Sequence, residues 1–204
     1  MPIINDQSLT ALCERDKIFA DIIKLYDRPQ SWEREPGFET LARIILEQQV
    51  SLESAFAAYT QLKGRLGAFT PENLLLLTDA EMRTAYISRQ KTRYLRELAK
   101  AVTVGTLDFS VLPKLSAAEA KTELTKIVGI GNWTAEVYLM FCLQSPDIFP
   151  AGDIAAVNTV KELKGATDKE VAVQIAAQWS PFRTAATFLL WHYYLCRRGR
   201  RVDY

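Results

Sequence analysis

The chain of 204 residues has little of what metal sites, disulfide frameworks and membrane spans require. It has one histidine, His192, so a histidine base or a histidine-rich metal site would depend on that residue alone. Its three cysteines are scattered and have no Cys-x-x-Cys spacing, which argues against disulfides, structural zinc and iron–sulfur clusters. No apolar run approaches the roughly 20 residues of a membrane span, and the N-terminus does not resemble a secretory signal. We therefore expect a cytoplasmic protein without a cofactor.

Charge is nearly balanced overall but unevenly distributed along the chain. Apolar residues make up 49% and charged residues 24%, the balance of an ordinary globular protein, and the net charge is +1. The first 60 residues hold 6 basic and 10 acidic residues, whereas the remainder hold 19 and 14. The basic excess gathers in residues 83–100 and in the tail, residues 197–201. Such a surface fits a polyanion, although charge alone is better explained by a solvated helix face and a soluble tail.

Apolar residues recur at three- and four-residue steps, which predicts an all-α fold of roughly ten short helices. The first expected helix spans residues 8–26, and the last three span 154–163, 168–178 and 181–197. Only residues 103–109 could also form a strand. Helix starts are predicted at Ser51, Thr70-Pro71 and Ser88, and capping boxes at Thr78–Glu81, Ser116–Glu119 and Thr167–Glu170.

Residues 124–153 combine an anion-binding pattern with an acid. One predicted helix ends, the chain turns through Gly129 and Gly131, and a second helix begins at about Trp133. Backbone N–H groups at such a helix start can bind a phosphate. A loop with two prolines then leads to Asp153 at the mouth of the next helix. On local sequence alone, the glycines could form an ordinary turn between helices, and Asp153 could simply cap its helix.

The stretch Thr125–Ala135 resembles the helix–hairpin–helix of the base-excision DNA glycosylases, and Phe149–Asp153 resembles the Gly/Pro-rich loop and aspartate of that superfamily, known as HhH-GPD. Residues 38–51, 88–95 and 179–191 resemble further segments of the family in the same order. The nearest branch is the bacterial 3-methyladenine DNA glycosylase II group, which repairs alkylation damage. The resemblance covers about residues 34–196. It implies one domain over residues 1–204, with an active-site cleft between a lobe of about 35–115 and a lobe of 1–34 plus 116–204.

The resemblance implies a catalytic role for Asp153, whose carboxylate would stabilise positive charge on the sugar and orient the attacking water. Trp133 stands where bifunctional members carry a lysine nucleophile, so no AP-lyase activity is expected. Trp133 and Trp191 would form aromatic walls around a cationic alkylated purine. Tyr138 is a further candidate for the base pocket, one place removed from the family's aromatic position, where this chain has Val137.

The same resemblance implies a set of DNA contacts. Gln49 would be the wedge that fills the gap left by a flipped base, and the remaining candidate contacts are Gly129, Gly131, Thr134, Ser88 and Lys91. Main-chain carbonyls of Thr125, Ile127 and Ile130 would be the ligands of a monovalent cation, and no metal site formed by side chains is expected. Because the helical pattern begins near residue 8, we expect the chain to be without the N-terminal mixed domain of the full-length bacterial enzyme. It also lacks the C-terminal cysteines of the endonuclease III branch.

We therefore expect a monofunctional glycosylase that excises alkylated purines, such as 3-methyladenine and 7-methylguanine, in base-excision repair. Its partner would be damaged double-stranded DNA, and it would act without a membrane, as a monomer associated with the bacterial nucleoid. Two alternatives remain open. One is a glycosylase for uracil, hypoxanthine or ethenoadenine on the same scaffold, and the other is a noncatalytic helix–hairpin–helix module that binds DNA.

Overall fold

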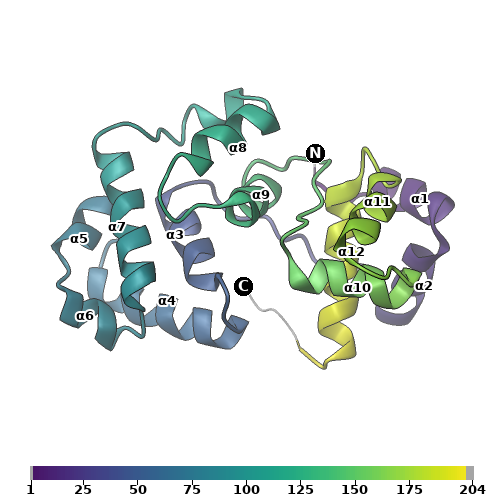
Figure 1. Cartoon of the computed structure of the whole chain (residues 1–204), viewed down its shortest axis with the longest axis horizontal. Helices are drawn as coiled ribbons and strands as arrows, with labels where there is room; N and C mark the ends of the chain where they lie inside the picture. Colours follow the sequence, from purple (N-terminus) through teal and green to yellow (C-terminus); the bar gives the residue numbers. More distant parts are fainter. Residues whose placement is uncertain (1, 201–204) are drawn as a thin grey trace. The chain divides into compact units, whose positions relative to one another are not determined.

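The computed structural model describes residues 2–200, and all regular structure in that range is helical (Figure 1). The all-α prediction is therefore confirmed, and residues 104–109 form turns rather than a strand. The helices are α1 (Asp6–Arg15), α2 (Lys17–Tyr26), α3 (Phe38–Glu47), α4 (Leu52–Leu66), α5 (Pro71–Leu76), α6 (Asp79–Thr84), α7 (Arg89–Thr103), η1 (Leu112–Lys114), α8 (Ala117–Thr125), α9 (Asn132–Phe141), α10 (Ile154–Lys164), α11 (Lys169–Ala177) and α12 (Arg183–Arg197). None of these helices could span a membrane. Arg201 of the basic tail lies outside the described residues.

The chain divides into two compact units. Unit 1 comprises Met1–Glu33 and Gln144–Tyr204, and unit 2 comprises Arg34–Leu143. The sequence placed a boundary near residue 115, whereas the structure places residues 116–143 together with 34–115. The reason is that α9 packs against α3 within unit 2. The Gly37 amide donates to the Tyr138 hydroxyl at 3.0 Å, and the Arg34 amide donates to the Phe141 carbonyl at 3.0 Å.

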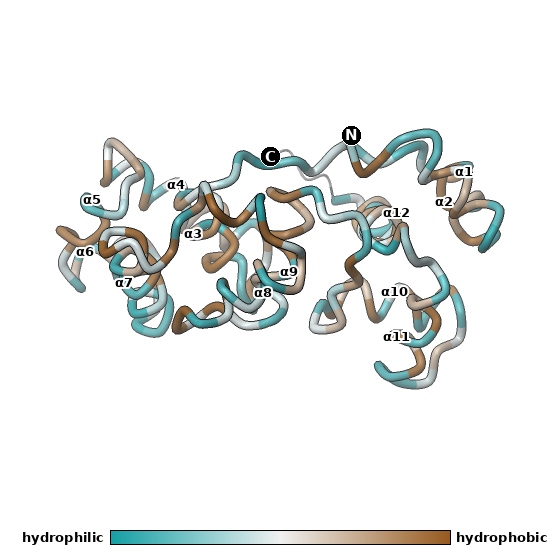
Figure 2. Tube along the Cα trace, turned by 90° about the horizontal axis from the view of Figure 1, so that it is seen from above, coloured by the Kyte–Doolittle hydropathy of each residue, from teal (hydrophilic) through white to brown (hydrophobic). Residues whose placement is uncertain are grey.

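Unit 2 is built around α3, which has a broad apolar face and a narrower charged face formed by Glu39, Arg43 and Glu47. Leu41, Ile44 and Ile45 have no exposed surface, and α3 packs against α4, α7 and α9. Figure 2 shows α3 as a largely hydrophobic segment of the trace. Burial of each such side chain is worth about 1.5–3 kcal/mol. This helix therefore anchors both the segment that follows it and the helices that carry the hairpin.

Unit 1 is built around α12, which packs on α2 and α10. The expected single helix over residues 8–26 is wrong, because the chain breaks at Asp16. This residue adopts an extended conformation and its side chain accepts a hydrogen bond from the Ile18 amide, so it caps a new helix, α2. Asp16 also accepts a hydrogen bond from the indole N–H of Trp179 at 3.3 Å. Trp179 in turn packs edge-on against Phe19 in the core, with 5.0 Å between ring centroids.

Most predicted helix starts are confirmed. Ser51, Thr70 and Ser88 each cap the helix that follows, and Thr78 and Ser116 form the expected capping boxes. The box predicted at Thr167–Glu170 is wrong by one position. Asp168 is the cap and accepts a hydrogen bond from the Val171 amide at 2.8 Å. A carboxylate suits this place because it also meets the positive end of the helix dipole.

Candidate functional site

The carboxylate of Asp153 is fixed at the start of α10 in unit 1. Its backbone amide donates to the Pro150 carbonyl at 2.8 Å, which closes a turn directly ahead of the helix. Its side chain then caps α10, since Oδ1 accepts a hydrogen bond from the Ala156 amide at 2.8 Å. The sequence allowed Asp153 to be a cap or a functional acid. The structure confirms the cap, and that geometry holds the carboxylate in one place.

A second donor reaches the same oxygen from α12. The indole N–H of Trp191 donates to Asp153 Oδ1 at 2.9 Å. Hydrogen bonds to an ionised acceptor are stronger than those between neutral groups. The carboxylate is half-buried and is held by a helix amide and by a side chain of another helix. Trp191 thus acts on the orientation of Asp153, a role that the sequence did not predict for it.

Trp191 is itself held by two aromatic rings. It stacks on Phe188 at 5.9 Å between centroids with 25° between the ring planes. Trp32 lies 6.0 Å from Trp191 and 5.2 Å from Phe188, edge-on to both. Sequence reasoning missed Trp32. It stands in a non-helical stretch before the matched motifs, and its only signal was that a tryptophan is uncommon between two prolines in an otherwise polar segment.

An ion pair ties the loop before Asp153 to the start of α12. Arg183 Nε donates to Asp147 Oδ1 at 2.7 Å, and its Nη2 donates to Oδ2 at 3.0 Å. Ser180 Oγ also donates to Oδ2 at 2.7 Å. Burial acts to raise the pKa of the Asp147 carboxyl, but the hydrogen bonds from Arg183 and Ser180 outweigh it and leave this pKa below its usual value. The segment over residues 179–183 therefore has a structural role in placing α12.

Gly129 in the hairpin of unit 2 is required by both its backbone and its surroundings. Its backbone φ is +95°, a value that residues other than glycine rarely adopt. A Cβ placed there would lie 2.1 Å from Cγ of Tyr94 on α7. Gly131, in contrast, has open space around a Cβ and serves as the N-cap of α9 without a side-chain hydrogen bond. Tyr94 therefore packs against the hairpin at Gly129, whereas a Cβ at Gly131 would have no other atom within 4 Å.

The segment after α3 is fastened on both sides to its own unit. The Gln48 side chain donates to the Gly129 carbonyl at 2.9 Å and to Thr134 Oγ1 at 2.8 Å. Lys91 Nζ donates to the Leu46 carbonyl at 2.6 Å, and burial lowers the pKa of Lys91 although Glu47 acts to raise it. Thr134 is only 2% exposed. Thr134 and Lys91, expected to touch DNA, thus bind other parts of unit 2.

Gln49 directly follows these two attachments in the chain. It is exposed and adopts φ of +55°, in the left-handed region that few residues other than glycine occupy. Such strain is tolerated where the surrounding structure enforces it, and it is common at functional sites. Val50 next to it is 46% exposed. The candidate wedge is therefore an exposed residue between the anchored end of α3 and Ser51, the N-cap of α4.

The remaining predicted residues of unit 2 lie in different environments. Trp133 is half-buried in the first turn of α9, and Ser88 is exposed at the start of α7. Tyr138 has no exposed surface, its hydroxyl accepts the Gly37 amide, and burial raises its pKa. A side chain so enclosed packs in the core, so we do not include Tyr138 in the base pocket. Asp153 and Trp191 are thus brought together in unit 1, while the hairpin, Gln49 and Trp133 belong to unit 2.

The candidate cation ligands are main-chain groups of the hairpin. Thr125 ends α8, and the Ile127 carbonyl accepts the Ile130 amide at 3.0 Å. Within residues 2–200, no group of three or more His, Cys, Asp or Glu side chains could hold a metal ion. The side chains of the described residues therefore offer no alternative metal centre.

Comparison with known proteins agrees with this geometry. The family of HhH-GPD superfamily base excision DNA repair proteins matches residues 42–182. The chain belongs to this family. Its HhH-GPD segment includes the hairpin, Asp147 and Asp153, and it ends one residue before Arg183. The family and the all-helical glycosylase fold predicted from the sequence are both confirmed.

Several relatives of this HhH-GPD protein carry related names. A DNA-3-methyladenine glycosylase of Bacillus subtilis is 30% identical over 76% of this chain, and DNA-3-methyladenine glycosylase 1 of Schizosaccharomyces pombe is 30% identical over 90% of it. A solved S. pombe 3-methyladenine DNA glycosylase in complex with abasic DNA has 28% identity and a TM-score of 0.83, covering 97% of this chain and 98% of that one. This chain spans 83% of the S. pombe relative but only 56% and 58% of two B. subtilis relatives.

Proposed function

We propose that this HhH-GPD protein is a monofunctional DNA glycosylase that releases alkylated purines from double-stranded DNA in base-excision repair. The observation that carries the proposal is the fixed carboxylate of Asp153, whose Oδ1 is held by the Ala156 amide and the Trp191 indole. Relatives named DNA-3-methyladenine glycosylases support the choice of alkylated bases over deaminated ones.

The proposed reaction breaks the bond between the base nitrogen and C1′ of the sugar. The bonding electrons leave with the base, and positive charge develops on the sugar, where the Asp153 carboxylate stabilises it. Water then adds to C1′, and its proton passes to the carboxylate or to solvent. A purine alkylated on a ring nitrogen is cationic and becomes neutral as it leaves, so no acid has to protonate it. The single histidine is consistent with this scheme, because its Nε2 lies 2.8 Å from the Tyr26 carbonyl.

Aromatic groups would select the damaged base. Stacking of a cationic purine on Trp133 would contribute about 0.5–2 kcal/mol beyond ordinary contact. In unit 1, Trp191 would contact the damaged base while it donates its hydrogen bond to Asp153. Since Trp133 offers no amine, a Schiff base with the sugar cannot form there, and the product is an abasic site without strand cleavage.

The hairpin would hold the DNA backbone while the base is extruded. The start of α9 at Gly131 offers backbone N–H groups and a favourable dipole to a phosphate, contacts that position the protein without reading sequence. Gln49 would fill the gap in the duplex, supported by Gln48 and Lys91 from within unit 2. Ser88 would contact the backbone, and the carbonyls of Thr125, Ile127 and Ile130 would bind a monovalent cation that neutralises a nearby phosphate.

The protein would act as a monomer on the chromosome, which in a bacterium means association with the nucleoid. Size-exclusion chromatography with light scattering, with and without a duplex, tests the monomer. A complex that contains one protein chain per lesion duplex is expected. Two chains per lesion would contradict it.

The test of the reaction is base release from a panel of duplexes. Methylated DNA, DNA with uracil, DNA with hypoxanthine and DNA with ethenoadenine are each incubated with the wild type and with Asp153→Asn. We expect release of 3-methyladenine and 7-methylguanine by the wild type, none by the variant, and duplex binding by both. Release confined to uracil, hypoxanthine or ethenoadenine would replace the proposed substrate. Duplex binding without release of any base would identify a noncatalytic module.

A further inference from the structure

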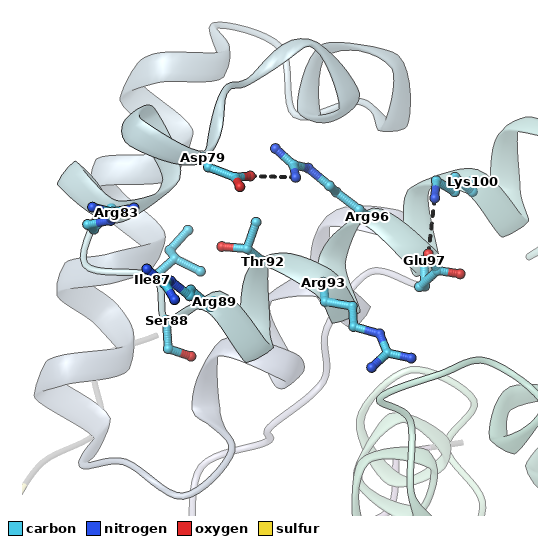
Figure 3. A pocket seen from close by; sticks show the side chains of 10 residues that line it. All are labelled: Asp79, Arg83, Ile87, Ser88, Arg89, Thr92, Arg93, Arg96, Glu97 and Lys100. Carbon is cyan, nitrogen blue, oxygen red and sulfur yellow. Dashed lines mark hydrogen bonds and ion pairs between the residues drawn. The ribbon is translucent and has the colours of Figure 1, made fainter.

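A basic groove lies along α7 in unit 2, apart from the hairpin. It is a cavity of about 640 Å³ formed by α6, the turn after it and α7 (Figure 3). Its lining residues, which define the α7 groove, are Asp79, Arg83, Ile87, Ser88, Arg89, Thr92, Arg93, Arg96, Glu97 and Lys100. Five of these ten side chains are cationic and two are acidic. The groove thus accounts for most of the basic excess seen in residues 83–100.

The cations of the α7 groove fall into two groups. Arg96 and Lys100 are paired with acids of the groove, Asp79 at 2.6 Å and Glu97 at 3.1 Å. The other three, Arg83, Arg89 and Arg93, are exposed, and none forms an ion pair with a carboxylate of residues 2–200. Three neighbouring arginines without counter-charges repel one another. The groove therefore carries positive charge that the described part of the chain does not neutralise.

The arrangement on α7 works against the stability of the helix itself. Arg89 and Lys91 stand in its first turn, which has no acid, although cations are disfavoured at the positive end of a helix. Arg89 and Arg93 are also four residues apart, a spacing at which like charges destabilise a helix. Stability alone does not explain these residues. An anionic ligand would explain them, because it would supply the missing counter-charges.

The spacing of the groove favours a polyanion over a single small anion. Arg89, Arg93, Arg96 and Lys100 follow one side of α7 over about 16 Å of helix. A DNA strand presents a phosphate about every 3.4 Å along its axis, so this length faces about five phosphates. The planar guanidinium groups suit phosphate oxygens, which they bind in pairs. An acidic protein segment would not generally offer such an even row of charges.

The same helix, α7, lines the groove and contacts the hairpin. Tyr94 of α7 lies directly against Gly129 of the hairpin, while its sequence neighbour Arg93 lines the groove. We propose that the α7 groove binds the sugar-phosphate backbone of duplex DNA outside the contact made by the hairpin. The inference rests on the proposed function in taking DNA as the partner. It adds a second phosphate-binding surface, which increases affinity without regard to base sequence.

The test measures duplex affinity as salt is varied, with Asp153→Asn as the parent so that no base is released during the measurement. Into this parent we introduce Arg83→Gln, Arg89→Gln and Arg93→Gln together. Each phosphate contact that is lost lowers the slope of log affinity against log salt by about 0.9. We therefore expect a slope smaller by about 2–3 and, at physiological salt, an affinity at least about tenfold weaker.

A charge-matched control removes three exposed lysines of unit 1. Lys17→Gln, Lys24→Gln and Lys169→Gln on α2 and α11 cause the same loss of net charge. The control should retain most of the slope and affinity of the parent. Thermal unfolding of both triple variants checks the fold. Since Arg83, Arg89 and Arg93 form no ion pair with any carboxylate of residues 2–200, their replacement should not lower Tm.

Two results would overturn the α7 groove as a DNA surface. One is an unchanged salt slope in the arginine variant, or an equal change in the lysine control. The other is an unchanged DNA affinity together with lost binding of a polyglutamate peptide, which would assign the groove to an acidic protein partner.

Base release by the wild type is measured separately. A smaller salt slope without any base release would support the groove and reject the proposed reaction, whereas base release with an unchanged slope would reject only the groove.

Discussion

The starts of α10 and α9 are both helix N-termini, but they differ in whether a side chain of the protein caps them. At α10 the chain supplies its own anion, since Asp153 caps the helix and the Ala156 amide fixes the carboxylate. At α9 the cap is Gly131, which makes no side-chain hydrogen bond to the helix. A helix start attracts negative charge in either case. The first therefore holds in place the carboxylate for which we propose the catalytic role, and the second is suited to a phosphate from outside the chain.

Replacing the acid at the start of α10 should have the largest effect, and the quantity that it changes is the rate of base release. Asparagine is as good a helix cap as aspartate, so Asp153→Asn should leave Tm nearly unchanged. Its neutral amide cannot stabilise the positive sugar, and the single-turnover rate of base release should fall by a factor on the order of a thousand. Asp168→Asn, the same change at the cap of α11, is the matched control. A comparable loss of base release in Asp168→Asn would show that the effect of Asp153→Asn is structural.

The hairpin glycines should separate folding from DNA contact. In Gly129→Ala the new methyl group would meet the Tyr94 ring at a backbone angle that alanine resists, so we expect a loss of about 3 kcal/mol in unfolding free energy. Gly64→Ala, in the last turn of α4 with open space around it, should instead gain up to about 0.5–1 kcal/mol. Chemical denaturation measures both. Equal stability of the two variants would contradict the packing of Gly129 on Tyr94.

Trp191→Phe should show how much of the chemistry depends on the second donor to Asp153. The change keeps an aromatic ring against Phe188 but removes the N–H that reaches Oδ1, and we expect base release slower by about tenfold with duplex affinity retained. Trp32→Phe is the control, because it causes a similar loss of packing in the same aromatic cluster without touching Asp153. Equal rates for the two variants would assign Trp191 to packing alone.

A smaller effect is expected at Asp147, the structural acid close to Asp153 in sequence. Its folded pKa lies below the unfolded value, so its ion pair with Arg183 stabilises the protein above the unfolded pKa of about 3.9 and is lost as pH falls below it. The contribution should be about 1 kcal/mol, since both side chains are partly exposed. Tm measured from pH 6 downward should therefore drop less steeply in Asp147→Asn than in the wild type. If the curves of Tm against pH run parallel in the two proteins, the Asp147–Arg183 ion pair does not contribute to stability in this pH range.

The sequence predicted the fold class and most helix starts because those depend on local patterns. Ser88 and Ser116 cap their helices through residues three positions away, so the signal lies within one turn. The break at Asp16 was missed because the apolar spacing continues through it. Contacts with Trp179 and Lys164, both far along the chain, show why the aspartate stays at a helix start.

The site residues stay predictions, because motifs alone select them. The motifs could not show which atoms of these residues bind other parts of the protein. Thr134 and Lys91 are directed to Gln48 and to the Leu46 carbonyl, and Tyr138 to the Gly37 amide. Trp32 lies outside the motifs and joins the site through Phe188 and Trp191, distant in sequence. Such contacts depend on tertiary packing, which no local pattern records.

The central claim is that the start of α10 performs the chemistry while the start of α9 holds the DNA. The most direct measurement compares Asp153→Asn and Gly131→Ala with the wild type, recording duplex affinity and the base-release rate at saturating protein side by side. We predict that Asp153→Asn binds like the wild type but does not release the base. Gly131→Ala, whose methyl group would intrude on the phosphate without clashing inside the protein, should bind more weakly but release the base when saturated. Base release by Asp153→Asn at the wild-type rate would contradict the account.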